Sequence, residues 1–227
     1  MTRLDRLTWP DVAAVADRSL LVVPVGSTEQ HGPHLPLATD LVVASALADR
    51  LAAARDDVLV GPGVPYGSSG EHAGFAGTLS IGQAALESLL VELVRSADAF
   101  RAVVLLSGHG GNAEPVARAV AVATHEGRRV TAWSPRVAGG DAHAGSTETS
   151  LLLALGEPVL LDRAEAGDPR PIEELLPDLR AGGVAAVVAN GVLGDPTGAG
   201  AEQGRRILDQ LTADLVAFVD AFVRSLG

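Results

Sequence analysis

The feature that most constrains the fold is the alternation of short apolar runs with longer stretches of helical periodicity. Apolar runs of strand length occupy residues 20–25, 58–60, 102–106, 130–133 and 184–188. Apolar residues recur at helical spacing over residues 10–17, 41–54, 82–98, 113–125 and 201–224. Runs that are apolar throughout are typical of strands buried on both faces. The alternation therefore predicts an α/β fold, in which a mostly parallel sheet carries helices on both faces.

The chain of 227 residues is long enough for one such domain with a substantial core, and we expect residues 1–227 to form a single domain. Residues 162–182 are charged and contain proline, so we expect a surface excursion there, followed by a Gly-rich loop at 191–200. The polar start does not resemble a signal peptide, and no apolar run approaches the ~18 residues of a membrane span.

Composition removes several function classes. The net charge of -11 argues against nucleic acid or an anionic membrane as the main partner. The chain has no cysteine, which excludes disulfides, thiolate zinc sites and a cysteine nucleophile, and a disulfide-free enzyme suits the cytoplasm. It also has no lysine for a Schiff base. A catalytic metal site in this chain must therefore use histidine and carboxylate ligands.

The richest segment is residues 25–40, which follow the first predicted strand and read VGSTEQHGPHLPLATD. Glu29 and His31 are two residues apart and point to the same side if the segment is extended. Asp40 stands at the start of the next predicted helix, where either it or Thr39 could serve as the cap. His34 fits a supporting role better than ligation.

Two later segments, 107–112 (SGHGGN, with His109) and 135–148, also follow predicted strands. Ligands of parallel sheets bind beyond the carboxyl ends of the strands, so the three segments predict one composite site. A carboxylate shared by two ions would make the site dinuclear, and two ions can activate water for amide hydrolysis without a covalent intermediate.

Several residues admit two interpretations. The glycines around His109 either let the backbone approach the site or form a phosphate cradle, although no Walker spacing accompanies them. His143 suits proton transfer to a leaving amine. Glu148 is either a site residue or an ordinary capping-box glutamate. In the long loop 61–80, Ser69, Glu71 and His72 either contact the substrate or are exposed loop residues.

Taken together, these motifs resemble the creatininase (creatinine amidohydrolase) family. The resemblance rests on the 25–36 segment, Asp40, Ser69-Gly-Glu-His, Gly77-Thr-Leu-Ser, the SGHGGN segment and His143-Ala-Gly-Ser-Thr-Glu, in the family's order over about residues 20–155. It implies a three-layer α/β/α sandwich, two divalent metal ions, Fe(II) or Zn(II), and a ring-like homo-oligomer, often a hexamer.

Carried over position by position, the resemblance implies that Glu29 and His109 bind one metal and His31 the other, with Asp40 as the bridge. His143 and Glu148 match residues that handle substrate and protons. Gly111 departs from the creatinine-cleaving members, which carry an acidic ligand there, so the second metal either takes another ligand, for which Glu148 is the candidate, or is weakly held. The family's Phe-Pro-Gly-Thr reads Phe75-Ala-Gly-Thr here.

The departure at Gly111 argues against creatinine as the substrate. The likeness is greatest to members that act on a modified precursor peptide, which implies hydrolysis of a Gly-Val amide bond near its C-terminus and release of a Val-Tyr-derived piece. Two alternatives are a hydrolase of a small cyclic amide or a formamide, and a metal-stabilised scaffold that only binds a partner.

Overall fold

A computed structural model of the protein describes residues 3–227 and contains a four-stranded parallel sheet in the order β2-β1-β3-β4. β1 (Leu20–Val25) pairs with β2 (Val58–Val60) on one side and with β3 (Ala102–Ser107) on the other, and β4 (Val130–Trp133) pairs with β3. These are the first four strands that the apolar runs predicted.

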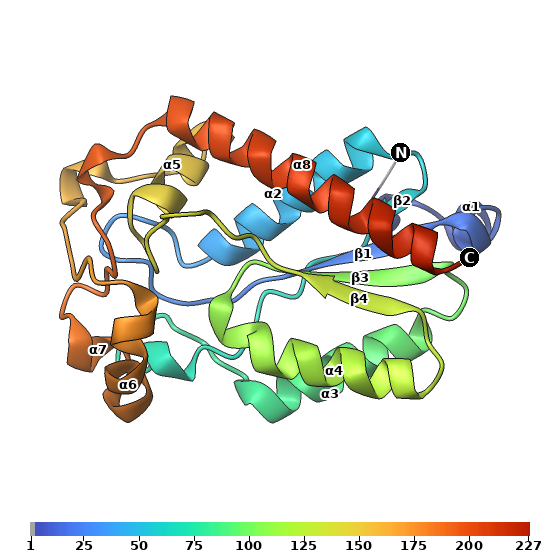
Figure 1. The fold of residues 1–227 in the computed structure, drawn as a ribbon, viewed down its shortest axis with the longest axis horizontal. Coiled ribbons are helices and arrows are strands. Elements are labelled where there is room, and N and C mark those ends of the chain that lie inside the picture. The colour runs from blue at the N-terminus through green and yellow to red at the C-terminus, as the bar shows by residue number, and fades with distance from the viewer. Residues whose placement is uncertain (1–2) are drawn as a thin grey trace.

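Helices cover both faces of the sheet (Figure 1). α2 (Thr39–Ala54), α5 (Ser146–Leu155) and α8 (Ala201–Ser225) pack on one face, and α3 (Gly82–Ser96) and α4 (Ala113–His125) on the other. Neighbouring residues of β1 point to opposite cores: Leu20 packs in the α2/α8 core and Leu21 in the α3/α4 core. Because each strand feeds two cores, its residues are apolar throughout, and the three-layer prediction is confirmed.

The remaining helices are shorter. α1 (Trp9–Ala13) precedes the sheet, and α6 (Ile172–Gly182) and α7 (Val184–Val187) lie beyond the carboxyl ends of the strands, to the left in Figure 1. One-turn 3₁₀ helices occur at Leu4–Arg6, Ala16–Arg18, Gly70–His72, Gly110–Asn112, Leu161–Arg163 and Pro196–Gly198. Within residues 3–227, no helix combines the length and the apolar character needed to cross a membrane.

Two sequence predictions were wrong in this part of the fold. The run 184–188 is the one-turn helix α7 rather than a strand: Val184 packs against Leu175 and Leu193 in a small separate cluster away from the sheet. The surface excursion expected over 162–182 agrees with the exposure of this segment, in which only Leu175 is buried; it contains α6, which tolerates Pro177 inside it. The helix expected over 10–17 ends at Ala13.

The strand order places a topological switch point between β1 and β3. The chain leaves β1, passes through α2 to β2 on one side, and then returns through α3 to β3 on the other side. Crossovers that diverge in this way leave a crevice at the carboxyl ends of the two central strands. The loops that carry Glu29, His31 and His109 start at these two strand ends.

Candidate metal centre

The loop after β1 is folded tightly back on itself. The backbone N–H of Glu29 donates to the carbonyl of Leu37 at 3.0 Å, and His31 forms bridges with Pro33 and Leu35. Gly32 adopts a φ of +64°, and a Cβ there would lie 2.7 Å from the side chain of Val192. The glycine thus permits the turn that brings Glu29 and His31 over the end of the sheet.

The end of β3 approaches the start of α2 just as closely. A Cβ on Gly108 would lie 2.3 Å from the carbonyl oxygen of Asp40, so no other residue fits without moving backbone. The approach puts Nδ1 of His109 3.1 Å from Glu29 Oε1 and 3.5 Å from Asp40 Oδ2. The glycines beside His109 therefore allow the end of β3 to approach the start of α2 closely. Asp40 does not cap α2; its side chain turns inward instead.

The side chains form two groups that share one carboxylate. Glu29, Asp40 and His109 make the first group, and His31, Asp40 and Glu148 make the second. In each group the candidate ligand atoms lie within 4.8 Å of one another. Glu29, His31 and His143 satisfy the same criterion. Asp40 thus occupies the position between two potential ion sites.

Both oxygens of Glu29 and Oδ2 of Asp40 are buried and find no hydrogen-bond partner among residues 3–227. Burying carboxylate oxygens without partners costs several kcal/mol unless a counter-charge is present. Divalent cations would supply that charge, and nitrogen and oxygen donors suit zinc, iron and manganese. The donor set therefore fits the two ions that the family resemblance implies.

Ionisation in the centre reflects this crowding of charges. Burial and the neighbouring Glu29 raise the pKa of Asp40 to about 6. Burial opposes protonation of His31, but Asp40 outweighs it and raises the pKa of His31 to about 9. For Glu29, burial is outweighed by His109, which holds the pKa of this carboxyl well below its ordinary value. Without metal, protons on imidazoles take the place of the cations.

His143 faces the centre in a neutral state. Its Nε2 lies 2.8 Å from the carbonyl oxygen of Gln30, to which it donates, so Nδ1 carries the lone pair and lies 3.9 Å from Glu29 Oε1. Burial and the neighbouring His31 lower the pKa of His143 to about 4. Two backbone hydrogen bonds with Leu193 hold the residue in place. The ring can accept a proton at Nδ1.

Glu148 is placed as a site residue and not as a capping-box glutamate, because the cap residue of α5 is Gly145 and no capping box forms. Its Oε2 accepts a hydrogen bond from the backbone N–H of Ala144, the residue before the cap, at 2.6 Å. The same oxygen lies 4.0 Å from Nε2 of His31, within the second group. Ala144, between His143 and the helix, is the described non-glycine residue with a positive φ, +53°. Such strain is common where a loop must direct a functional side chain.

The loop 61–80 contributes unequally. His72 is buried, with Nε2 3.2 Å from Glu29 Oε1, and burial lowers its pKa to about 3. Glu71 lies against His109 and lines the cavity. Ser69 does not fit the expected substrate contact, because it is fully buried and accepts a hydrogen bond from the Ser27 hydroxyl. His34 lies outside both groups and contacts the hydroxyl of Thr149 at 2.9 Å.

The sequence did not predict a role for two residues near the centre, Gln30 and Asp141. The side-chain amide of Gln30 lies 2.9 Å from Nδ1 of His72 and donates to the carbonyl of Gly191. Asp141 caps α5, since its carboxylate accepts from the N–H groups of Ser146 and Thr147. Its signal in the sequence was an acidic residue shortly before the Gly145-Ser146-Thr147 helix start. Gly191 and Gly194 let the 191–194 stretch approach both residues.

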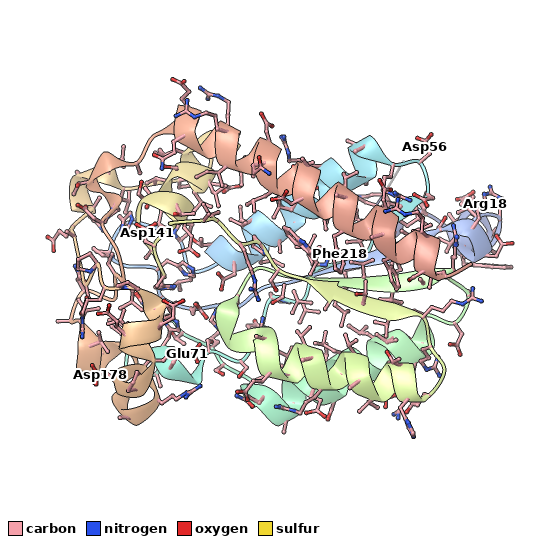
Figure 2. The ribbon with its side chains drawn as sticks, viewed as in Figure 1. Arg18, Asp56, Glu71, Asp141, Asp178 and Phe218 are labelled. Carbon is pink, nitrogen blue, oxygen red and sulfur yellow. The ribbon has the colours of Figure 1, made fainter. Side chains whose placement is uncertain are left out.

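A cavity of about 1000 Å³ opens over the centre. Of the two metal groups, Asp40, His109 and Glu148 line the cavity, together with His143. Asp141 and Glu71 also line it, and both lie at the left in Figure 2, beyond the carboxyl ends of the strands. α6 and α7 form an opposite wall that includes Ile172, Leu176 and Val184. The space thus joins a polar reactive floor to an apolar side.

Known proteins resemble the chain in sequence. The profile of the family described as creatinine amidohydrolase matches residues 5–219. The mycofactocin precursor peptide peptidase of Mycolicibacterium smegmatis is 52% identical over 200 residues, which are 85% of this chain and 81% of that protein. The peptidase of the same name from Mycobacterium tuberculosis is 50% identical over 208 residues, 86% of this chain and 82% of that protein. Creatinine amidohydrolase of Pseudomonas putida is 30% identical over 236 residues, 89% and 90% of the two chains.

Solved structures resemble it in fold. A crystal structure of creatinine amidohydrolase superposes with a TM-score of 0.83 at 27% identity, over 99% of this chain and 98% of that chain. A structure described as creatininase Mn gives 0.83 at 29% identity, over 96% and 97% of the chains. A mutant creatininase of Zn-Zn type gives 0.82 at 28% identity, over 96% of each chain.

Proposed function

Because the chain belongs to the creatininase (creatinine amidohydrolase) family, we propose that it is a dinuclear metallopeptidase that cleaves the modified mycofactocin precursor peptide. The family and the peptidase relatives make it a hydrolase of C–N amide bonds. The bond we propose is the Gly-Val amide near the C-terminus of that peptide, whose hydrolysis releases the Val-Tyr-derived piece. The observation that carries the proposal is Asp40, shared by two ligand groups at the floor of a cavity.

The cavity supports a peptide over a small cyclic amide. Its volume of about 1000 Å³ is at the upper end of the ~300–1,000 Å³ of small-molecule sites. The apolar side chains of Ile172 and Leu176 on its wall, both more than a third exposed, suit the aliphatic and aromatic side chains of a Val-Tyr segment. A small ring would leave most of this wall in contact with water.

We propose that Glu29, Asp40 and His109 hold the first ion and that His31, Asp40 and Glu148 hold the second. The second group thus obtains its acidic ligand from α5, while position 111 is glycine. When bound, two divalent ions lower the pKa of a water molecule and polarise the carbonyl that it attacks. Zinc and iron are the ions we propose, on the basis of the histidine and carboxylate donors.

His143 is the residue we propose for proton transfer. Its Nδ1 accepts the proton that the attacking water loses, and the same atom then donates this proton to the leaving amine nitrogen as the C–N bond breaks. The hydrogen bond from Nε2 to Gln30 fixes the tautomer that this role requires. Glu71 and His72 line the cavity and are proposed to border the bound substrate.

We further propose a homo-oligomer, with a hexameric ring as the form that the family resemblance implies. Leu89 and Leu93 lie one turn apart on α3 and are each more than a third exposed, so they offer an apolar strip for a neighbouring subunit. Light scattering combined with size-exclusion chromatography measures the mass, and a monomer at micromolar concentration would contradict this proposal.

Metal content and peptide cleavage test the function together. We expect two ions per chain in the wild type, none in Asp40→Ala, and one in each of His109→Ala and His31→Ala, measured by elemental analysis after dialysis. Asp49→Ala is the control, because Asp49 lies on the same helix but pairs with Arg3 at the surface. Mass spectrometry of the modified peptide should show cleavage by the wild type and by Asp49→Ala only.

Three results would change the assignment. Full metal content in Asp40→Ala would refute the shared ligand. Turnover of creatinine or of a formamide with no cleavage of the peptide would favour the small-amide alternative. Two bound ions with no hydrolysis of any amide would favour a binding scaffold.

A further inference from the structure

The two ring nitrogens of His109 contact different groups. Nδ1 faces Glu29 and Asp40 in the first metal group. Nε2 lies 3.1 Å from the carbonyl oxygen of Ser68 and 3.2 Å from Glu71 Oε1. Because a carbonyl oxygen only accepts, the proton of the neutral ring stays on Nε2, and the lone pair of Nδ1 points at the metal group.

Gly111 creates the space in which Glu71 reaches this ring. A Cβ at position 111 would lie 2.3 Å from Glu71 Oε1, 2.4 Å from His109 Nε2 and 2.5 Å from the carbonyl oxygen of Ser68. Any side chain at 111 would therefore separate the ring from both of its acceptors. Position 111, where the resemblance predicts an acidic residue, is a glycine. The space beside it is occupied by the carboxylate of Glu71 from a different loop.

The backbone of Glu71 is held as closely as its side chain. A Cβ on Gly183, which has a φ of +70°, would lie 2.6 Å from the carbonyl oxygen of Glu71. Gly183 joins α6 to α7, so these helices pack directly on the one-turn helix Gly70–His72. The side chain of Glu71 retains 32% exposure and lines the cavity, where Figure 2 shows it below the strand ends.

We propose that Glu71 is a positioning residue for the first metal group, which it serves through His109. Its carboxylate and the Ser68 carbonyl hold the ring so that Nδ1 faces Glu29 and Asp40. A carboxylate on the outer nitrogen of a metal-bound histidine also strengthens the ring as a ligand, and losing such a partner typically costs about 10–100-fold in metal affinity. The inference rests on the metal groups proposed above, and not on the identity of the peptide.

The test measures zinc affinity at each site by competition with a chromogenic chelator. For Glu71→Gln and Glu71→Ala we expect the affinity of one of the two ions to fall about 10–100-fold while the other is unchanged. Glu114→Gln is the matched control, since Glu114 lines the same cavity and pairs only with Arg118 among the described residues. It removes the same charge and should leave both affinities at the wild-type value.

Cobalt(II) gives a second readout that does not depend on turnover. The visible absorption of cobalt in the first site should shift in Glu71→Gln, because the donor strength of His109 changes, and should stay unchanged in Glu114→Gln. If both Glu71 variants bind two ions with wild-type affinity and spectrum, the proposal is overturned. An increase in KM for the peptide with unchanged metal binding would also overturn the positioning role and would leave Glu71 as a substrate contact alone. A failure of peptide cleavage alone, with the metal results as expected, would count against the proposed substrate and not against this role.

Discussion

Asp141→Ala is the most informative perturbation of the scaffold around the centre, because this carboxylate caps the helix that carries Glu148. The helix α5 starts after Gly145, which has no side chain to serve as a cap. Asp141 replaces the cap from outside: it accepts from the N–H of Ser146 at 2.7 Å and from the N–H and hydroxyl of Thr147 at 2.9 and 2.6 Å. A Cβ on Gly145 would lie 2.0 Å from Asp141 Oδ2, so the glycine makes room for this contact.

The magnitude follows from these contacts. Loss of an N-cap costs about 1 kcal/mol, and up to about 2 kcal/mol in proteins. Loss of a negative charge at a helix N-terminus adds about 0.3–1 kcal/mol. We therefore expect Asp141→Ala to lower the free energy of unfolding by about 2 kcal/mol. For a chain of this size, at about 2–4 °C per kcal/mol, the melting temperature should fall by about 4–8 °C.

The effect should depend on pH in a defined direction. Burial alone would raise the pKa of Asp141, but the hydrogen bonds from Thr147 and Ser146 lower it below the ordinary 3.8. A lowered pKa in the folded state gives stability that is present above pH 3.8 and is lost as the pH falls through the folded value. The difference between wild type and Asp141→Ala should therefore be constant near neutrality and shrink in acid.

Urea unfolding of the metal-free protein, followed by circular dichroism at pH 7 and pH 3, measures this difference. Asp195→Ala is the control: Asp195 is exposed and accepts from the N–H and hydroxyl of Thr197 in the same pattern, but it caps a one-turn helix without a site residue. Because Asp195 caps only a single turn, its loss should cost about 0.5–1 kcal/mol, the lower part of the range for a lost cap. An Asp141→Ala protein as stable as Asp195→Ala, or equally weakened at both pH values, would refute the reasoning.

Two further predictions concern helix packing and protons. A Cβ on Gly204 of α8 would lie 1.8 Å from the carbonyl oxygen of Ser150 on α5. Gly204→Ala should therefore lower the free energy of unfolding by about 1–3 kcal/mol or more, measured by thermal unfolding. Gly198→Ala is the control and should be neutral, because a Cβ at position 198 meets open space. Asp40 outweighs burial and raises the pKa of His31 to about 9, so zinc must displace a proton from this ring when it binds. In competition titrations the affinity for zinc should therefore rise from pH 6.5 to pH 9. Over the same window the stability of the metal-free protein should fall, because the protonated ring contributes stability that is lost as the pH rises through 9. A flat affinity profile would contradict the placement of zinc at His31.

How far the sequence predicted this centre depended on the range of the interactions. Glu29, His31 and His109 follow buried strands whose apolar runs are unmistakable, so the rule that ligands gather at carboxyl ends brought them together correctly. Asp40 was predicted at the right place, but its possible role as a cap was wrong, because contact with His31 turns the side chain inward.

Residues that act through contacts distant in sequence could not be predicted in the same way. The hydrogen bonds of Gln30 reach Gly191, and nothing in the sequence around either residue indicates that contact. The run 184–188 is as apolar as a strand, yet Val184 packs on Leu175 and not on the sheet. A short apolar run indicates that a segment is buried, but it does not indicate which element the segment packs against.

Position 111 gives a second example of a contact, distant in sequence, that could not be predicted. In the sequence, Gly111 reads as the loss of an acidic ligand, and the loss alone would weaken any metal assignment. In the structure, the absence of a Cβ at 111 gives Glu71 access to the outer nitrogen of His109, while Glu148 joins the second group from α5. One carboxylate, from Glu71, thus lies beside position 111, and another, from Glu148, belongs to the second group. A substitution at one site of a metal centre is best judged by which side chains enter the space that it leaves.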